Sequence, residues 1–210
     1  MDGRSESSTV NFGDVRSSEY NDKFCEKFKP KRVISGRNTM FVLTEGGYVI
    51  VRGQMEAELE EIPEFPKCFF LTSLSNKKIC FGSAGYTHAC FVSEEGKAYY
   101  WNLANQLVNL SETVDFEFFV GCSSMGEAAV LLTRSGKIYS VTHGHVDYIS
   151  LEVIKQVGNT RISNIPAPFF CVAIATGYNY LVALSNFGKL FGIGSKWTIF
   201  LIGRKYHFAR

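Results

Sequence analysis

The sequence predicts an all-β fold, a β-propeller of about four blades, and two observations predict it. The first is a repeat: an apolar pair, then a serine or threonine, then a glycine three residues after it, occurs four times, with spacings of 49, 40 and 52 residues between the glycines. A period of roughly 40 to 50 residues with several strands in each unit is typical of propellers. The second is that each glycine lies between two short apolar or aromatic stretches that read as paired strands. The glycines are Gly47, Gly96, Gly136 and Gly188.

Each repeat is expected to form a β-hairpin whose turn ends at the glycine. A tight hairpin turn needs a residue with positive φ there, and glycine adopts that conformation without strain. Eleven residues before the turn glycine, three of the four repeats again have glycine, which indicates a crowded strand edge without room for a side chain. The turns are predicted at Thr44–Gly47, Ser93–Gly96, Thr133–Gly136 and Ser185–Gly188, and the structural repeat positions are Gly36, Gly47, Gly85, Gly96, Gly136, Gly177 and Gly188.

The second repeat carries a family resemblance. It has Gly85, His88, Ser93, Gly96, Tyr100, Trp101 and Asn102 in order. This pattern resembles the repeat of the regulator of chromosome condensation family, which has Gly, His-Thr, a hydrophobic pair, Thr, Asp-Gly, a short aromatic strand and Trp/Phe-Gly. The likeness spans about residues 10 to 203, but it is divergent, since only this repeat keeps the histidine. The resemblance implies a propeller of that family's type.

The chain divides into a tail and a propeller. Residues 1–23 are polar and lack the apolar core of a signal peptide, so a flexible tail is expected there, followed by a partial propeller over 24–210. Within the tail, Val10 to Gly13 looks like the end of a repeat unit, and an N-terminal strand that completes the last blade is an alternative for it.

The four repeats predict an incomplete ring. They fill the chain, whereas seven blades would need on the order of 350 residues at propeller spacing. The expectation is either a compact four-unit arc or a truncated product that exposes an apolar strand edge and needs further blades or self-association. A fragment and a short isoform of a longer propeller protein both fit this pattern.

The sequence provides no catalytic, cofactor-binding or metal-binding set. His143-x-His145-x-Asp147 is the most metal-like string, but Tyr148 stands where a metallo-hydrolase motif has a further histidine, so a polar loop is the favoured interpretation. The six cysteines have no Cys-x-x-Cys spacing and are expected to be free thiols. The basic cluster of Lys27, Lys29, Lys31 and Arg32 follows a tail of mixed charge, so it does not form a nucleic-acid-binding arm.

An uncharged run from Ile162 to Gly188 raises the question of a membrane span. Pro166, Pro168 and the fourth hairpin lie inside this run, so two buried strands explain it better. No cofactor is expected, and the chain is expected to be intracellular, in the cytoplasm or the nucleus.

The expected function is that of a non-catalytic protein-interaction propeller rather than an enzyme. The family resemblance implies partners such as small GTPases, chromatin, kinases or ubiquitin-ligase machinery, so the role would be that of a small-GTPase regulator or an adaptor. The alternative is a guanine-nucleotide exchange factor for a small GTPase, for which no motif in this chain marks catalytic residues. A metal-dependent enzyme at His143 and His145 is a distant alternative.

Overall fold

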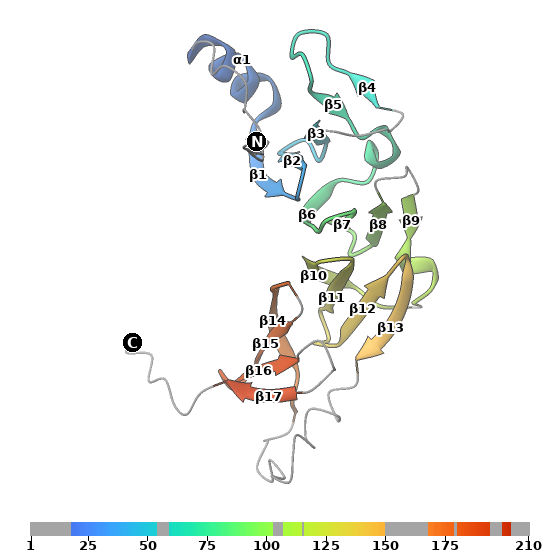
Figure 1. Ribbon diagram of the computed structural model, residues 1–210. Helices are drawn as coiled ribbons and strands as arrows, with labels where there is room; N and C mark the ends of the chain where they lie inside the picture. Colours follow the sequence, from blue (N-terminus) through green and yellow to red (C-terminus); the bar gives the residue numbers. More distant parts are fainter. Residues whose placement is uncertain are drawn as a thin grey trace, which may run out of the picture.

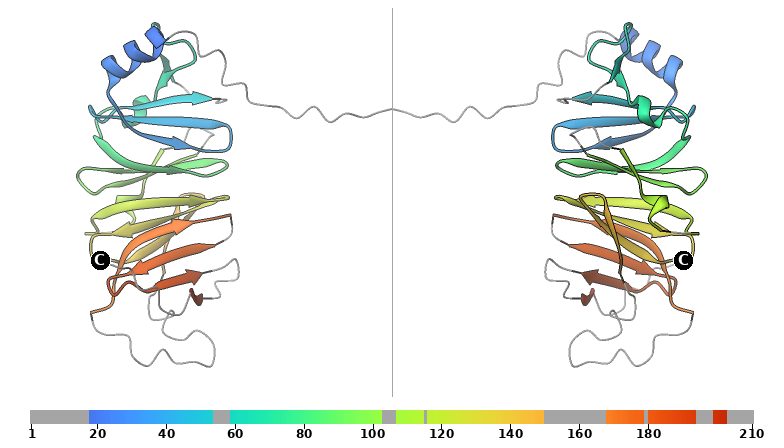
Figure 2. Two further views of the ribbon diagram at one scale, coloured as in Figure 1. Left: turned by 90° about the vertical axis from the view of Figure 1, so that its left-hand side faces the viewer. Right: turned by 90° about the vertical axis from the view of Figure 1, so that its right-hand side faces the viewer.

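Four antiparallel sheets follow one another along an arc in the computed structural model (Figure 1). The structure describes residues 18–53, 59–102, 107–114, 116–149, 168–178, 180–193 and 199–202. Figure 2 shows the sheets stacked in chain order, from the first at the top to the fourth at the bottom. The described sheets do not close into a ring. The predicted all-β propeller of about four blades in an incomplete ring is therefore confirmed.

Each blade is built from strands that are neighbours in the sequence. Blade 1 has β1 (Pro30–Ser35), β2 (Thr39–Thr44) and β3 (Val49–Gly53), extended by β5 (Phe69–Phe70) and β4 (Glu60–Glu61). Blade 2 has β6 (Ile79–Ala84), β7 (His88–Ser93), β8 (Ala98–Asn102) and β9 (Leu107–Asn109). Blade 3 has β10 (Phe119–Met125), β11 (Ala128–Thr133), β12 (Ile138–Thr142) and β13 (His145–Ile149). Blade 4 has β14 (Cys171–Thr176), β15 (Leu181–Ser185), β16 (Leu190–Ile193) and β17 (Ile199–Ile202). Two 3₁₀ turns, η1 (Thr72–Leu74) and η2 (Leu110–Glu112), follow β5 and β9.

The first strand of every blade lies at the inner edge of the arc. β1 contacts β6, β6 contacts β10, and β10 contacts β14, so these four strands line the concave side (Figure 1). Each inner strand has a β-bulge at the same place, where one residue is left out of the pairing with the second strand. The bulged residues are Lys31, Cys80, Val120 and Val172.

The core lies between blades, and each blade uses its two faces differently. Side chains alternate between the faces of a strand. Phe41 and Leu43 on one face of blade 1 pack against Phe91 and Trp101 of blade 2. The same relationship recurs between blades 2 and 3 and between blades 3 and 4. Every blade therefore has one face directed at the preceding blade and one directed at the next.

The four hairpin turns form where the sequence predicted them. In each turn the glycine N–H donates to the carbonyl of the serine or threonine three residues earlier. The φ angles of Gly47, Gly96, Gly136 and Gly188 are 79°, 75°, 80° and 71°. The hydroxyl of the serine or threonine accepts a hydrogen bond from the N–H after the glycine, as Thr133 does from Lys137 at 3.0 Å. The buried hydroxyl thereby has a partner, which explains the Ser/Thr in every repeat.

Helix α1 (Ser18–Phe28) precedes the first blade and was not predicted from the sequence. Its Phe24 and Phe28 pack against Phe65, and this cluster covers the face of blade 1 that carries Val42 and Ile50. The helix begins at Ser18, inside the stretch over residues 1–23 for which a flexible tail was expected. Residues 1–17, including Val10 to Gly13, lie outside the described residues.

Candidate functional site

The turns between the first and second strands of all four blades lie together at one end of the concave side of the arc. These turns are residues 36–39, 85–88, 125–128 and 177–180. Together with the ends of the inner strands they line an open recess of about 320 Å³. We call this recess the channel mouth, because it lies at one end of the concave side that the inner strands form.

The second residue of each turn determines which side chains are present at the channel mouth. These residues are Arg37, Tyr86, Gly126 and Tyr178 in blades 1 to 4. The rings of Tyr86 and Tyr178 meet with centroids 5.7 Å apart, although they belong to blades 2 and 4. Blade 3 leaves room for this contact because it has glycine at the same place. The guanidinium carbon of Arg37 lies 5.3 Å from the Tyr86 ring centroid, in a cation–π arrangement.

The tyrosines of the channel mouth remain accessible. Tyr86, Tyr178 and the neighbouring Tyr180 are 42%, 61% and 51% exposed. Their backbone is nonetheless fixed, since the N–H of Tyr86 donates to the carbonyl of Gly126 at 3.0 Å and so joins blade 2 to blade 3. Large aromatic side chains held on hydrogen-bonded turns lose little conformational entropy when a partner covers them.

A layer of hydroxyl groups connects the inner strands beneath the tyrosines. The hydroxyls of Ser123 and Thr176 lie 2.8 Å apart, and Thr176 donates to the carbonyl of Ser124 at 2.7 Å. The N–H of Ser124 donates to the hydroxyl of Ser83 at 2.9 Å. The described residues that line the mouth include no His, Cys, Asp or Glu. This arrangement offers aromatic stacking and hydrogen bonding, and its described lining lacks the imidazole and carboxylate groups that most often act in acid–base chemistry.

Three of the sequence-predicted repeat glycines lie directly behind the channel mouth. A Cβ on Gly85 would collide with the ring of His88, and a Cβ on Gly177 would collide with the ring of Tyr180. A Cβ on Gly36 would lie 3.0 Å from the carbonyl oxygen of Gly85. These glycines therefore occupy crowded positions at the ends of the inner strands, where turns of adjacent blades approach one another.

His88 is a buried histidine rather than an exposed ligand. It is 2% exposed and stacks on Tyr100, with ring centroids 5.3 Å apart. Burial lowers the pKa of His88 to about 4, because removal from water penalises the imidazolium, and the nearby His143 lowers the pKa further. The backbone of Ala128 opposes this shift in part, but neither ring nitrogen has a hydrogen-bond partner of normal geometry among the described residues. His88 is thus neutral at physiological pH.

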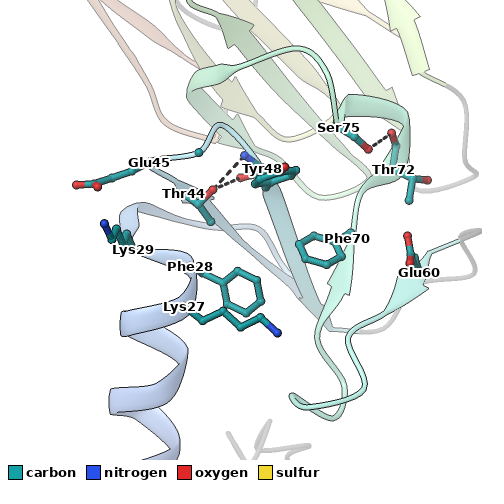
Figure 3. Close-up of a pocket in the computed structure, with 11 residues that line it drawn as sticks. Lys27, Phe28, Lys29, Thr44, Glu45, Tyr48, Glu60, Phe70, Thr72 and Ser75 are labelled. Atoms are coloured by element: carbon teal, nitrogen blue, oxygen red, sulfur yellow. Dashed lines mark hydrogen bonds between the residues drawn. The ribbon is translucent and has the colours of Figure 1, made fainter.

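A second recess, of about 750 Å³, lies between α1, the first hairpin turn and η1 (Figure 3). Phe28 from α1, Phe70 from β5 and Tyr48 after the turn provide its aromatic part, and the rings of Tyr48 and Phe70 are 5.9 Å apart. Lys27 and Glu60 line it as well, and the ammonium of Lys27 pairs with the carboxylate of Glu64 at 2.5 Å. Lysine and glutamate side chains both line this recess, so its charge favours neither anionic nor cationic ligands.

The basic cluster of the sequence analysis is divided by the structure. Lys27 is on α1, where Glu64 neutralises it, and Lys31 and Arg32 are on the inner strand β1. The guanidinium carbon of Arg32 lies 4.2 Å from the centroid of the Phe81 ring in blade 2. These residues therefore do not form one continuous patch.

The metal-like string lies on an outer hairpin. His143 and Gly144 have φ of 51° and 85° and form the two-residue turn between β12 and β13, while His145 and Asp147 are exposed on β13. Among the described residues, no three His, Cys, Asp or Glu side chains come together as they would around a metal. All six cysteines are free. Nothing in this geometry favours the metal-dependent enzyme.

The uncharged run is folded as strands over its described part, since β14 and β15 occupy residues 171–176 and 181–185. Residues 162–167 lie outside the described residues. Within the described part of the chain, no helix has the length and apolar character needed to cross a membrane.

Comparison with solved structures agrees with this architecture. Human WBSCR16 matches with a TM-score of 0.60 at 15% identity, over 80% of this chain and 48% of its own. Prp20p of Saccharomyces cerevisiae, which has described binding properties to Gsp1p and histones, matches with a TM-score of 0.56 at 17% identity, over 85% of this chain and 46% of its own. Yeast RCC1 (Prp20) bound to Kap60 matches with a TM-score of 0.54 at 14% identity, over 80% of this chain and 44% of its own.

These comparisons show the fold. The neighbours are RCC1-like β-propellers, and this chain has the RCC1-type fold that its repeats predicted. The chain spans about half the length of these solved structures. No protein-family model matches the sequence, and no curated protein matches it.

Proposed function

We propose that this chain is a non-catalytic protein-interaction propeller and that the channel mouth is its partner-binding surface. The observation that carries the proposal is the contact of Tyr86 with Tyr178, which assembles turns from separate blades into one exposed aromatic surface beside Arg37. Tyrosine and arginine are enriched among the residues that dominate binding energy at protein interfaces.

A small GTPase is the partner class that we propose to test first. Prp20p, which shares this fold, has described binding properties to Gsp1p. The sequence repeats independently resemble a family whose members contact small GTPases. The finer role is either that of an adaptor or regulator that binds the GTPase, or that of a guanine-nucleotide exchange factor. Either role places the chain inside the cell, in the cytoplasm or the nucleus.

Binding measurements on point variants test the surface. Small GTPases loaded with GDP, loaded with a GTP analogue or stripped of nucleotide would be titrated with the wild-type chain and with Tyr86→Ala and Tyr178→Ala. Loss of an aromatic anchor is expected to weaken binding by about 30-fold, the equivalent of about 2 kcal/mol. Tyr148→Ala is the matched control, since Tyr148 is equally exposed but lies on the outer strand β13.

The outcomes separate the proposals. An equal loss with Tyr148→Ala would remove the channel mouth as the binding surface, and no binding to any GTPase in any state would remove this partner class. Release of a labelled nucleotide from the GTPase distinguishes the two roles. Acceleration by the wild-type chain supports the exchange factor, whereas binding without acceleration supports the adaptor or regulator.

A further inference from the structure

Blade 4 has an apolar face that none of the other described blades covers. In blades 1 to 3, the residue before the turn hydroxyl is Leu43, Val92 or Leu132, and each is buried against the next blade. Leu184 is the equivalent residue of blade 4 and is only half-buried. Val182 and Leu190, which share its face, are also half-buried, and none of the three belongs to a hydrophobic cluster among the described residues. We call these three residues the open face of blade 4.

A hydrogen bond that joins the other blades is also missing at blade 4. The carbonyls of Gly47, Gly96 and Gly136 accept hydrogen bonds from the N–H groups of Ile79, Phe119 and Cys171, which begin the next inner strands. In the described part of the chain, Gly188 accepts no such bond. A Cβ built on Gly188 would meet nothing within 4 Å, whereas a Cβ on Gly96 would lie 2.5 Å from the Phe118 ring. No described residue therefore fills the joint at the end of blade 4.

Blade 1, at the opposite end of the arc, cannot form this hydrogen bond with a preceding blade. Pro30 begins β1 and takes the place of Ile79, Phe119 and Cys171, but proline has no N–H to donate. Helix α1 and the β4–β5 hairpin also cover the face of blade 1 that a preceding blade would use. Blade 1 of one copy thus cannot receive blade 4 of another, and head-to-tail rings or filaments are disfavoured.

The surroundings of the open face suit contact with an identical surface. Lys189 is the one charged side chain in the described part of blade 4, and residues 162–188 contain no charged residue at all. In a two-fold interface each surface meets its own copy, so an uncharged surface suffers no like-charge repulsion. Two further large apolar side chains, Val172 and Phe187, are exposed on the same blade.

We infer that the open face of blade 4 binds the same face of a second copy of this chain. The pair is closed by a two-fold axis, with one sheet packed face to face on the other. α1 and Pro30 lie at the far end of each copy, so the assembly stops at two. This contact is independent of the partner proposed for the channel mouth.

Light scattering and sedimentation of the full chain from about 1 to 100 μM test the inference, since this range detects micromolar association. We expect a dimer that gives way to monomer on dilution. Leu184→Glu is expected to abolish the dimer because it buries a charge against its own copy. Leu190→Arg provides a second variant on the same face, and Val33→Glu, an exposed apolar position on β1 of blade 1, is the matched control.

Circular dichroism and melting first establish that each variant is folded. A folded monomer for both open-face variants together with a dimeric Val33→Glu chain supports the inference. A wild-type chain that is monomeric at all concentrations overturns it, as does a dimer that survives both open-face variants. Growth beyond two copies would also overturn it, because it requires a head-to-tail contact.

Discussion

The ring of His88 occupies the space where a side chain on residue 85 would project, so Gly85 and His88 pack as one unit at the start of β7. The N–H of Gly85 also donates to the carbonyl of His88 at 2.9 Å. Gly177 and Tyr180 repeat both features in blade 4. In blades 2 and 4, the first glycine of the repeat is therefore required by the bulky side chain three residues later.

Replacement of Gly85 by alanine is expected to displace the His88 ring and to lower the free energy of unfolding by about 2 to 4 kcal/mol, in the range of severe overpacking. Denaturant unfolding measures the change. Gly121→Ala is the control, because a Cβ there would meet nothing within 4 Å and φ is not positive. We expect Gly121→Ala to be neutral or slightly stabilising. Similar losses in both variants would contradict the packing account.

The two turn glycines Gly96 and Gly188 are expected to respond differently to alanine. Both have positive φ, so each substitution costs about 1 kcal/mol of backbone strain. At Gly96 the new Cβ also collides with Phe118, which precedes β10 of the next blade. Gly96→Ala should therefore destabilise by roughly 3 kcal/mol in denaturant unfolding. Equal losses of stability in the two variants would mean that Phe118 moves away from a Cβ on residue 96 at no cost in free energy.

The stability of the chain is expected to fall in mild acid because of His88. Its pKa is about 4 in the folded protein and 6.5 when unfolded, so the unfolded state binds more protons between these values. The stabilisation is complete above pH 6.5 and is lost as the pH falls toward 4, by roughly 3 kcal/mol at most. Urea unfolding across this range should show a smaller pH dependence for His88→Gln. An unchanged pH dependence in that variant would exclude His88 as its source.

Helix α1 is expected to contribute to stability through Phe28, which is buried among Phe24, Phe65 and Phe70. Phe28→Ala should cost about 3 to 4 kcal/mol, as expected for loss of a buried aromatic ring. Thermal unfolding measures the loss. Phe116→Ala is the matched control, since Phe116 is fully exposed. A negligible effect at Phe28 would mean that α1 does not cover blade 1 in solution.

The repeat was predictable because its chemistry is local. Thr133 and Gly136 form one turn, and the need for a buried hydroxyl acceptor and a positive φ fixes both residue types within four positions. The bulges could not be predicted from the sequence, since no single residue type occupies all four bulged positions, Lys31, Cys80, Val120 and Val172. Helix α1 was missed because Phe24 and Phe28 are its main apolar contacts with blade 1 in an otherwise polar stretch.

The channel mouth could not be read from the sequence for a different reason. Arg37, Tyr86, Gly126 and Tyr178 hold the same place in their repeats, but they have no common chemistry that marks the position. Only the curvature of the arc brings Tyr86 and Tyr178 together over a glycine. A comparison of equivalent turn positions across the repeats is the signal that would have pointed to this surface.

The closure of blade 1 by Pro30 and α1 gives the array a direction in which it can be lengthened. A duplicated unit placed after blade 4 would find an apolar face and the carbonyl of Gly188, which accepts no hydrogen bond from the next strand within the described residues. A unit placed before blade 1 would require the loss of both the proline and the helix. Growth by gene duplication, or by design of an added blade, is therefore expected to succeed at the C-terminal side and to fail at the N-terminal side.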